Sequence, residues 1–302
     1  MVDVLAGRDV RGIMAWIKRL FALLAISCLL YFGWHARDLL GDIISSASLA
    51  LLASAVGMWL LMHLLSPLFA TVVFRGSGHK IAYQSALQIH LANLPARYIP
   101  GGIWHTVGRI VAFRGLGIDG NRIGFFVLLE NVLAAAVAFS LGGGLLFLYR
   151  GSDDWGNLAA LCAAAGGLVL LVLPVLLRLW MPGRGVEMLS RYYTGSIIVV
   201  VLTWIVGSAA FVLFVSSFAA LSLEMPLLET AAVYLFSWGV GFLAVFAPQG
   251  IGVFEVTAGQ LLRGTTALGG VAVLLAGFRA VIFIADLLAW VLGRLLLSRN
   301  TG

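Results

Sequence analysis

The sequence predicts an all-α polytopic membrane protein with about six full spans and two re-entrant helical hairpins, arranged as an inverted-topology repeat. Hydrophobic residues make up 62% of the 302-residue chain and charged residues 11%, and the mean hydropathy is +1.05. Soluble globular proteins hold about 45–50% apolar and about 25% charged residues, so that class is excluded. Many apolar runs exceed the roughly 18 residues that indicate a transmembrane helix. Two other apolar regions break in the same way, at Pro100-Gly101-Gly102-Ile103 and at Pro248-Gln249-Gly250-Ile251.

Full spans are predicted where an apolar run approaches or exceeds the roughly 20 residues that cross about 30 Å of hydrocarbon. They are expected at Ile17–Trp34, Ser45–Phe74, Ile123–Tyr149, Leu158–Trp180, Ile197–Leu221 and Leu268–Leu297. The chain is then one transmembrane domain, 1–302. It divides into an N-terminal segment with the first span (1–44), a first repeat (45–149), a linking span (150–196) and a second repeat (197–302).

Two pairs of shorter apolar runs predict the hairpins. Ile81–Leu94 and Ile103–Phe113 are too short to cross the bilayer, while Leu227–Ala247 and Gly250–Leu262 form the counterpart, with a longer first arm that could cross unaided. Broken backbone at bilayer depth is tolerated only beside protein or water, so the breaks indicate a binding site. The predicted tips comprise Pro95, Pro100, Gly101, Gly102, Pro248, Gly250 and Gly252. An alternative, in which both arms of either hairpin cross fully, leaves every loop on the same side.

The distribution of charge predicts the orientation. Basic residues gather in loops that are expected in the cytoplasm, and the intervening loops are acidic, with Asp38, Asp42, Asp153, Asp154, Glu224 and Glu229. Arg37, Arg150 and Arg263 are exceptions on the outer side. The net charge of +6 therefore reports topology rather than a nucleic-acid surface. Both termini are expected in the cytoplasm.

Ionisable residues inside apolar segments are the first candidate site residues, because each costs about 2.5–3.5 kcal/mol at the centre of a span on insertion scales. Glu130 with its neighbour Asn131, Glu255, Arg279 and Asp286 occupy such positions. Arg279 and Asp286 lie about two helical turns apart and so share a face of the last span. In one interpretation these groups only pair with one another to hold helices together. In the other they line a functional cavity.

The first break adds four further candidates, which are Arg97, Trp104, His105 and Arg109. The N-terminus of a re-entrant helix presents free N–H groups and a partial positive charge, which suits an anion. The arginines and the histidine add cationic and hydrogen-bonding groups, and the indole ring favours the headgroup level. This predicts a phosphate or a phospholipid headgroup as the guest. His63 and His90 are interpreted as satisfied structural histidines, and no metal site or cofactor is predicted.

Glycine runs at Gly142–Gly144 and Gly166–Gly167 lie inside apolar stretches, where small residues allow helices to approach closely. The sequence has no Walker lysine motif, Gly-x-Ser-x-Gly elbow or His-Glu-x-x-His motif. An ATP-driven pump and a membrane hydrolase are therefore unsupported, and we expect the protein not to be an enzyme.

The run from Leu94 to His105, followed by Gly108-Arg109, resembles the flippase-like transmembrane family, which includes the membrane region of lysylphosphatidylglycerol synthases and stand-alone relatives. Glu130 and the run from Pro248 to Glu255 match its other recurring motifs, although Gln249 stands where the family often has Gly. The resemblance implies lipid translocation between leaflets without ATP, or service to a lipid-linked glycan or hopanoid pathway. It does not imply lysyl transfer, because the soluble transferase domain of the synthases is not in this sequence.

Three hypotheses follow. The leading one is a lipid flippase whose hairpins line a cavity open to one leaflet at a time; the residues around the first break engage the phosphate, and the ionisable residues of the spans balance charge or relay protons. The second is a membrane subunit that presents lipid to a separately encoded glycosyl- or aminoacyl-transferase partner. The third is a proton-coupled carrier of a small soluble anion, which a lateral opening toward the bilayer would contradict. A second copy of the chain is a further expected partner.

Overall fold

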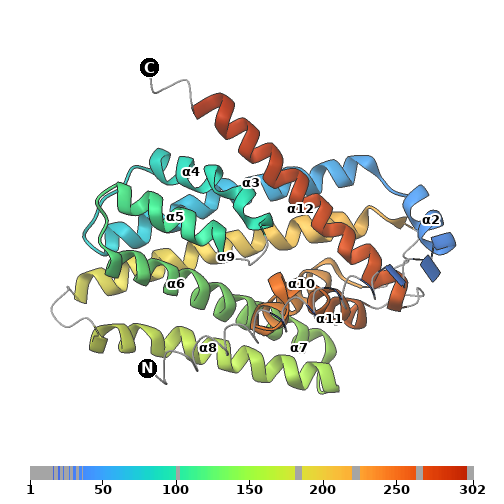
Figure 1. Ribbon diagram of the computed structural model, residues 1–302. Helices are drawn as coiled ribbons and strands as arrows, with labels where there is room; N and C mark the ends of the chain where they lie inside the picture. The colour runs from blue at the N-terminus through green and yellow to red at the C-terminus, as the bar shows by residue number, and fades with distance from the viewer. Residues whose placement is uncertain are drawn as a thin grey trace.

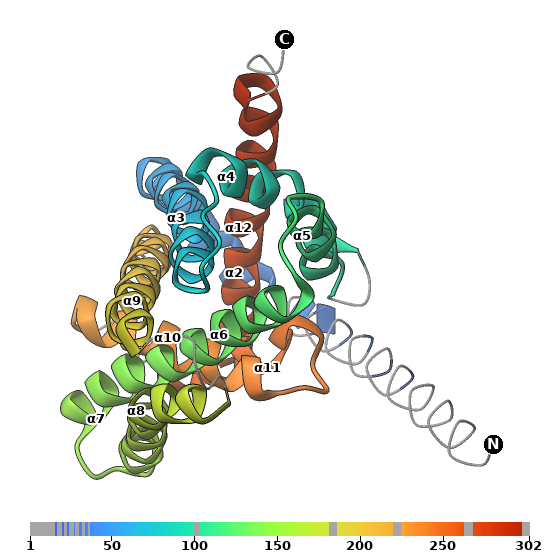
Figure 2. The ribbon, with the colours of Figure 1, turned by 90° about the vertical axis from the view of Figure 1, so that its left-hand side faces the viewer.

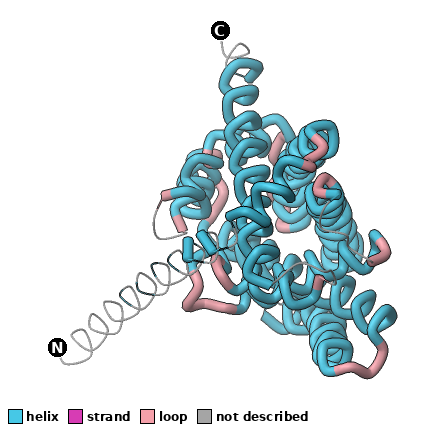
Figure 3. Tube along the Cα trace, turned by 90° about the vertical axis from the view of Figure 1, so that its right-hand side faces the viewer, coloured by secondary structure: helices cyan, strands magenta, loops and turns pink. Residues whose placement is uncertain are grey.

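The computed structural model describes residues 37–99, 103–180, 186–219, 225–262 and 268–297, with single positions between 16 and 35. Within these ranges the chain is helix and loop, without a strand, and one isolated bridge pairs Ala47 with Phe218 (Figure 3). The helices are α2 (Arg37–Ser45), α3 (Leu49–Gly76), α4 (Tyr83–Ala92), η1 (Leu94–Tyr98), α5 (Trp104–Gly115), α6 (Gly120–Ala138), η2 (Phe139–Gly143), α7 (Gly144–Arg150), α8 (Asp154–Trp180), α9 (Val186–Ser216), α10 (Leu227–Leu243), η4 (Pro248–Gly250), α11 (Val253–Leu261) and α12 (Leu268–Leu297).

Five stretches of helix are long and apolar enough to cross a membrane, which confirms the prediction of an all-α membrane protein. They are Leu49–Gly76, Gly120–Arg150, Asp154–Leu179, Tyr192–Ser216 and Gly270–Leu295. Each coincides with a span expected from the sequence. The remaining expected span, Ile17–Trp34, lies almost entirely outside the described residues.

Local hydrogen bonds fix where the spans begin. Ser48 caps α3, with its Oγ accepting from the backbone N–H of Leu51, and Asp119 caps α6 through two backbone N–H groups. The backbone N–H of Ser48 also donates to the carbonyl of Ser217 at 2.8 Å. The start of α3 is therefore tied to the end of α9, and these two helices pack along each other (Figure 1).

Helix α12 passes through the centre of the bundle. It crosses α3 in Figure 1, and Figure 2 shows it upright between α3 and α5. It packs against α3, α4, η1 and α11. Elements from both halves of the sequence thus meet on one helix, which is why its polar side chains can reach partners from each half.

Two groups of short helices pack beside this centre. We call α4, η1 and α5 the first helical pair, and α10, η4 and α11 the second helical pair. Helices α4, α5, α10 and α11 have 10, 12, 17 and 9 residues. At about 1.5 Å per residue even α10 is shorter than about 30 Å of hydrocarbon.

The breaks lie where proline and glycine predicted them. Pro95 lies in the first turn of η1, and the second break contains Gln249 at φ 54°, Gly250 at φ 67° and Gly252 at φ 84°. Glycine adopts such φ values without strain, so α10 cannot continue into α11 through this point. Of the other expected tip residues, Pro248 begins η4, whereas Pro100, Gly101 and Gly102 lie outside the described residues.

Buried aromatic clusters anchor each helical pair to the spans. Phe113 of α5 packs against Phe74 of α3 and Phe126 of α6. In the second pair, Phe254 of α11 contacts Tyr234 of α10, and both rings belong to a cluster with Phe211 and Phe278. These rings supply the apolar core on which the polar site is mounted.

Three expectations about loops were wrong. The loop expected to hold Asp38 and Asp42 is helix α2, because its apolar residues follow helical spacing. The first span of the second repeat was expected to begin at Ile197, but its helix α9 begins at Val186, inside the expected linking region. Glu229, expected in an outer loop, lies in the first turn of α10 with 3% of its surface exposed.

The glycine runs do allow close approach, but not at every position. The span Gly120–Arg150 contains a π-helical turn at η2, and a Cβ at Gly142 would lie 2.6 Å from Cβ of Leu235 on α10. A Cβ at Gly166 would lie 2.6 Å from the carbonyl oxygen of Ala136. At Gly144 and Gly167 nothing lies within 4 Å, so these two are not packing glycines.

Replacement of Gly142 by Ala is expected to lower the free energy of unfolding by about 1–3 kcal/mol, because the added methyl also meets the backbone nitrogen of Phe236 at 2.7 Å. Gly144→Ala is the matched control. It adds a methyl into open space two residues away and should leave stability unchanged or raise it by a few tenths of a kcal/mol through helix propensity. Unfolding by SDS in mixed micelles measures both. Equal effects of the two substitutions would contradict the packing role of Gly142.

Candidate functional site

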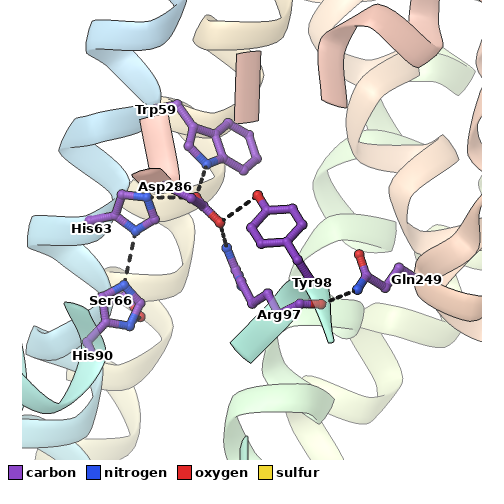
Figure 4. A network of polar contacts seen from close by, with 8 residues as sticks. All are labelled: Trp59, His63, Ser66, His90, Arg97, Tyr98, Gln249 and Asp286. Carbon is purple, nitrogen blue, oxygen red and sulfur yellow. Dashed lines mark hydrogen bonds and ion pairs between the residues drawn. The ribbon is translucent and has the colours of Figure 1, made fainter. Parts of the chain in front are cut away.

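Asp286 of α12 is the centre of the site. Its carboxylate is 1% exposed and accepts from Nε1 of Trp59 at 3.3 Å, from Arg97 NH1 at 3.1 Å and from the Tyr98 hydroxyl at 3.1 Å (Figure 4). Nε2 of His63 lies 2.9 Å from Oδ1 of Asp286, the oxygen that also accepts from Trp59. A buried carboxylate is stable only when it is paired and hydrogen-bonded, and these donors provide that. They come from α3 on one side and from η1 on the other.

A chain of histidines extends from Asp286 toward α4. Nδ1 of His63 lies 3.0 Å from Nε2 of His90, and Nδ1 of His90 lies 3.4 Å from Oγ of Ser66 (Figure 4). His63 and His90 are 3% and 5% exposed. The ring of His105 stands at 87° to that of His90, with centroids 5.9 Å apart. The two histidines interpreted as structural both contact polar partners, which makes them part of the site, although the contact of His63 Nε2 with Asp286 does not have hydrogen-bond geometry.

A second carboxylate, Glu255 of α11, binds a different residue of α12. Its Oε1 accepts from Nε of Arg279 at 2.6 Å, and its Oε2 accepts from the backbone N–H of Gly252 at 2.7 Å. Glu255 is fully buried. It therefore caps α11 and neutralises an arginine at once. Arg279 also donates to the carbonyl of Gln249 at 3.4 Å.

Gln249 joins the two breaks. Its Nε2 donates to the carbonyl oxygen of Arg97 at 2.6 Å, a contact between η4 of the second helical pair and η1 of the first (Figure 4). Arg97 in turn binds Asp286, and Arg279 binds the backbone of Gln249. The breaks in the two halves of the sequence are thus linked to each other and to α12.

Arg109 belongs to a separate pair. Both of its NH groups donate to Glu130 of α6, at 2.7 and 2.6 Å, and its guanidinium lies over the ring of Phe126 at 5.4 Å. This bidentate contact already satisfies the positive charge of Arg109, whose side chain is 7% exposed. It fastens α5 to α6. Arg109 is accordingly poorly placed to receive a phosphate, which is a revision of the expectation from sequence.

Three candidate residues remain, which are Trp104, Asn131 and His105. Trp104 begins α5 and is 46% exposed. Asn131 is exposed and donates to the carbonyl of Val127 on its own helix, so the structure does not bring it to the carboxylate of Glu130. Nε2 of His105 is buried and has no hydrogen-bond partner among the described residues. A buried nitrogen in that state is available to a ligand.

Arg150 explains one exception to the orientation rule. Its Nε lies 3.3 Å from Oε1 of Glu229, and both side chains are 5% exposed. This arginine, which the charge pattern predicted on the outer side, is buried against a carboxylate of α10.

Of the pairings expected among the ionisable residues, the one between Arg279 and Glu255 is present. Arg279 and Asp286 share a helix and do not contact each other in any described interaction; each binds a residue of a different helical pair. The sequence singled out these charged residues, but it missed Trp59, Tyr98, His63, His90 and Gln249. A signal was present in His63 and His90, since polar rings in apolar helices need partners. No sequence pattern identified the partners.

Comparison with known proteins adds no assignment. No family model matches the chain, and no curated protein matches it. Among the described residues, no group of three or more His, Cys, Asp or Glu side chains is placed to hold a metal ion.

An apolar cavity of about 250 Å³ opens beside the histidine chain, between α3, α4 and α12. His63 lies in its wall together with apolar side chains. Leu61, Leu64 and Leu292 form part of the wall and are 45%, 48% and 46% exposed. The cavity therefore opens on the outer surface of the helices and has a polar group within it.

Proposed function

We propose that this protein is a flippase-like lipid translocator, which moves a phospholipid or lipid-linked precursor between the leaflets of a bacterial inner membrane without ATP. The observation that carries the proposal is the apolar cavity beside His63, bounded by half-exposed leucines. On a helix surface in a bilayer those leucines contact lipid, so the cavity is open to acyl or prenyl chains. A carrier of a small soluble anion needs a polar cavity that is sealed from lipid, whereas this cavity is apolar and opens on the outer surface of the helices.

The headgroup is proposed to contact Arg97 and Arg279. Their side chains are 36% and 31% exposed, compared with 7% for Arg109, so they can be reached without opening the core. Each is held by a buried carboxylate, which keeps the arginine compensated when no phosphate is bound. A phosphate that approaches can replace the carboxylate as a partner, because both match the guanidinium fork. His105, with its unsatisfied buried nitrogen, adds a hydrogen-bonding group nearby.

We further propose that both helical pairs are re-entrant and form an inverted-topology repeat, with both termini in the cytoplasm. The shortness of α4, α5 and α11 supports this, as does the contact of Gln249 with Arg97. Sites in inverted repeats lie where the broken helices of the two halves meet. In this protein that point is the surface of α12 between Arg279 and Asp286.

Filling the cavity tests the function. Leu64→Trp places a large ring in the wall and is expected to slow lipid movement about tenfold, equivalent to about 1.4 kcal/mol in the barrier. Leu68→Trp, one turn further along α3, is the matched control; Leu68 is also exposed but does not line the cavity. The measurement is the loss of fluorescence of labelled phosphatidylglycerol on adding dithionite to proteoliposomes. Equal rates for the two variants, or no protein-dependent movement, would overturn the proposal.

A further inference from the structure

We propose that Ser66, His90, His63 and Asp286 form a proton-conducting chain that drives lipid movement. The inference rests on the proposed lipid function and deepens it by naming the driving ion. It starts from the three consecutive contacts of 3.4, 3.0 and 2.9 Å that join these side chains. All are within hydrogen-bonding distance, and they run from Ser66 on α3 to His90 on α4, back to His63 on α3 and then to Asp286 on α12.

The chemistry of the groups fixes the direction of the chain. The carboxylate of Asp286 only accepts, so Nε2 of His63 carries a proton, and Nδ1 of neutral His63 must then accept from His90. Nδ1 of His90 is consequently an acceptor for the hydroxyl of Ser66. Each histidine is held in one tautomer by its neighbours, and every donor faces Asp286. Such an ordered arrangement moves a proton one way without first rotating a ring.

The transfer balances as follows. A proton from the aqueous phase binds Oγ of Ser66 as its own proton passes to Nδ1 of His90. The proton on Nε2 of His90 moves to Nδ1 of His63, and the proton on Nε2 of His63 moves to Oδ1 of Asp286. One proton enters, one carboxylate becomes a neutral carboxyl, and both histidines end as the opposite neutral tautomers.

Neutralisation of Asp286 has a consequence at the breaks. The ion pair with Arg97, 3.1 Å in length, loses its charge, so the guanidinium becomes free to bind a phosphate. The carbonyl oxygen of Arg97 accepts a hydrogen bond from Gln249, so a movement of Arg97 would displace a residue of the second helical pair as well. Uptake of a proton thus prepares both breaks for the headgroup.

The groups around the proton chain disfavour a proton that remains on the ring of His90. His90 faces the positive charges of Arg97 and Arg109 and the ring of His105. The Tyr98 hydroxyl donates to the carboxylate of Asp286, and Tyr98 also interacts electrostatically with Arg279. Two arginines beside His90 oppose a lasting positive charge on its ring. The carboxylate at the end of the chain is the group that holds the proton once the transfer is complete.

The test uses the full chain in vesicles of phosphatidylethanolamine and phosphatidylglycerol, with a pH indicator inside and labelled phosphatidylglycerol as the lipid probe. An imposed gradient of one pH unit, acidic outside, should speed lipid movement in the wild type, with a ceiling of about tenfold for one coupled proton. His63→Gln and His90→Gln each interrupt the chain and should abolish both the acceleration and the protein-dependent proton uptake. His79→Gln is the matched control, because His79 lies in the turn after α3 and outside the chain.

The outcomes separate the two proposals. Lipid movement that is the same with and without the gradient overturns the proton chain and leaves the lipid function standing. Proton uptake that requires His63 and His90, without any lipid movement, supports the chain and overturns the lipid function. Absence of proton uptake in the wild type overturns the chain without reference to any variant, so a variant that fails to fold cannot decide the result.

Discussion

Replacement of Asp286 by Ala is expected to lower the free energy of unfolding by about 3–5 kcal/mol. The reason is that one carboxylate, 1% exposed, satisfies donors from Trp59, Arg97 and Tyr98 and lies against His63. Its removal leaves those donors without an acceptor in a medium that offers no water. The measurement is unfolding by SDS in mixed micelles, followed by tryptophan fluorescence.

Asp286→Asn separates shape from charge. The amide keeps one acceptor oxygen and removes the negative charge, as protonation does, so we expect a smaller loss of stability and lipid movement that no longer responds to a pH gradient. A loss below about 1 kcal/mol for Asp286→Ala would show that the carboxylate does not organise the site, because isolated hydrogen bonds alone are worth that much.

Replacement of Glu255 by Leu is expected to cost about as much, 3–5 kcal/mol, because it leaves Arg279 without its counter-ion and removes the cap from α11. The double variant Glu255→Leu/Arg279→Met should recover most of this loss, since it removes both charges together. The recovery should be incomplete, because the backbone N–H of Gly252 still lacks an acceptor.

The exposed pair of Arg37 and Asp38 is the control for this double-mutant cycle. Their side chains are 58% and 94% exposed at a separation of 3.7 Å, and Asp38→Ala should change stability by less than about 0.5 kcal/mol. A coupling between Glu255 and Arg279 as small as that of the exposed pair would contradict the assignment of Glu255 as a buried anchor.

The length of the apolar runs predicted the spans well, because the ability of a segment to cross a membrane depends on its local sequence. Twenty consecutive apolar residues must be helical in hydrocarbon, so α3, α8 and α12 are found close to where they were expected. The misassigned elements are those whose burial depends on distant partners. Glu229 was placed in a loop by its charge, yet Arg150 makes its burial possible. Likewise, α2 is short and its composition resembles a loop as much as a helix.

The candidate site also has a part that the sequence predicted and a part that depends on the tertiary fold. The cost of a charge in a membrane predicts which residues need partners, and it singled out Glu130, Glu255, Arg279 and Asp286, whereas Arg97 was singled out by its place near the first break. It cannot predict who the partners are, because Arg97 and Asp286 are 189 residues apart and meet only through the tertiary fold. Gln249 was noted only as part of the second break, and nothing in the sequence predicted that its side chain links the two breaks.

The long separation of Arg97 from Asp286 also sets an order of biosynthesis. At about 5–20 residues per second, Arg97 leaves the ribosome roughly 10–40 s before Asp286 does. During that interval the first helical pair lacks Asp286, the residue that will bind the guanidinium of Arg97. Its docking must await the last helix of the chain. Nascent chains that stall before α12 should therefore keep an unassembled N-terminal half, which makes them the natural targets of membrane quality-control proteases.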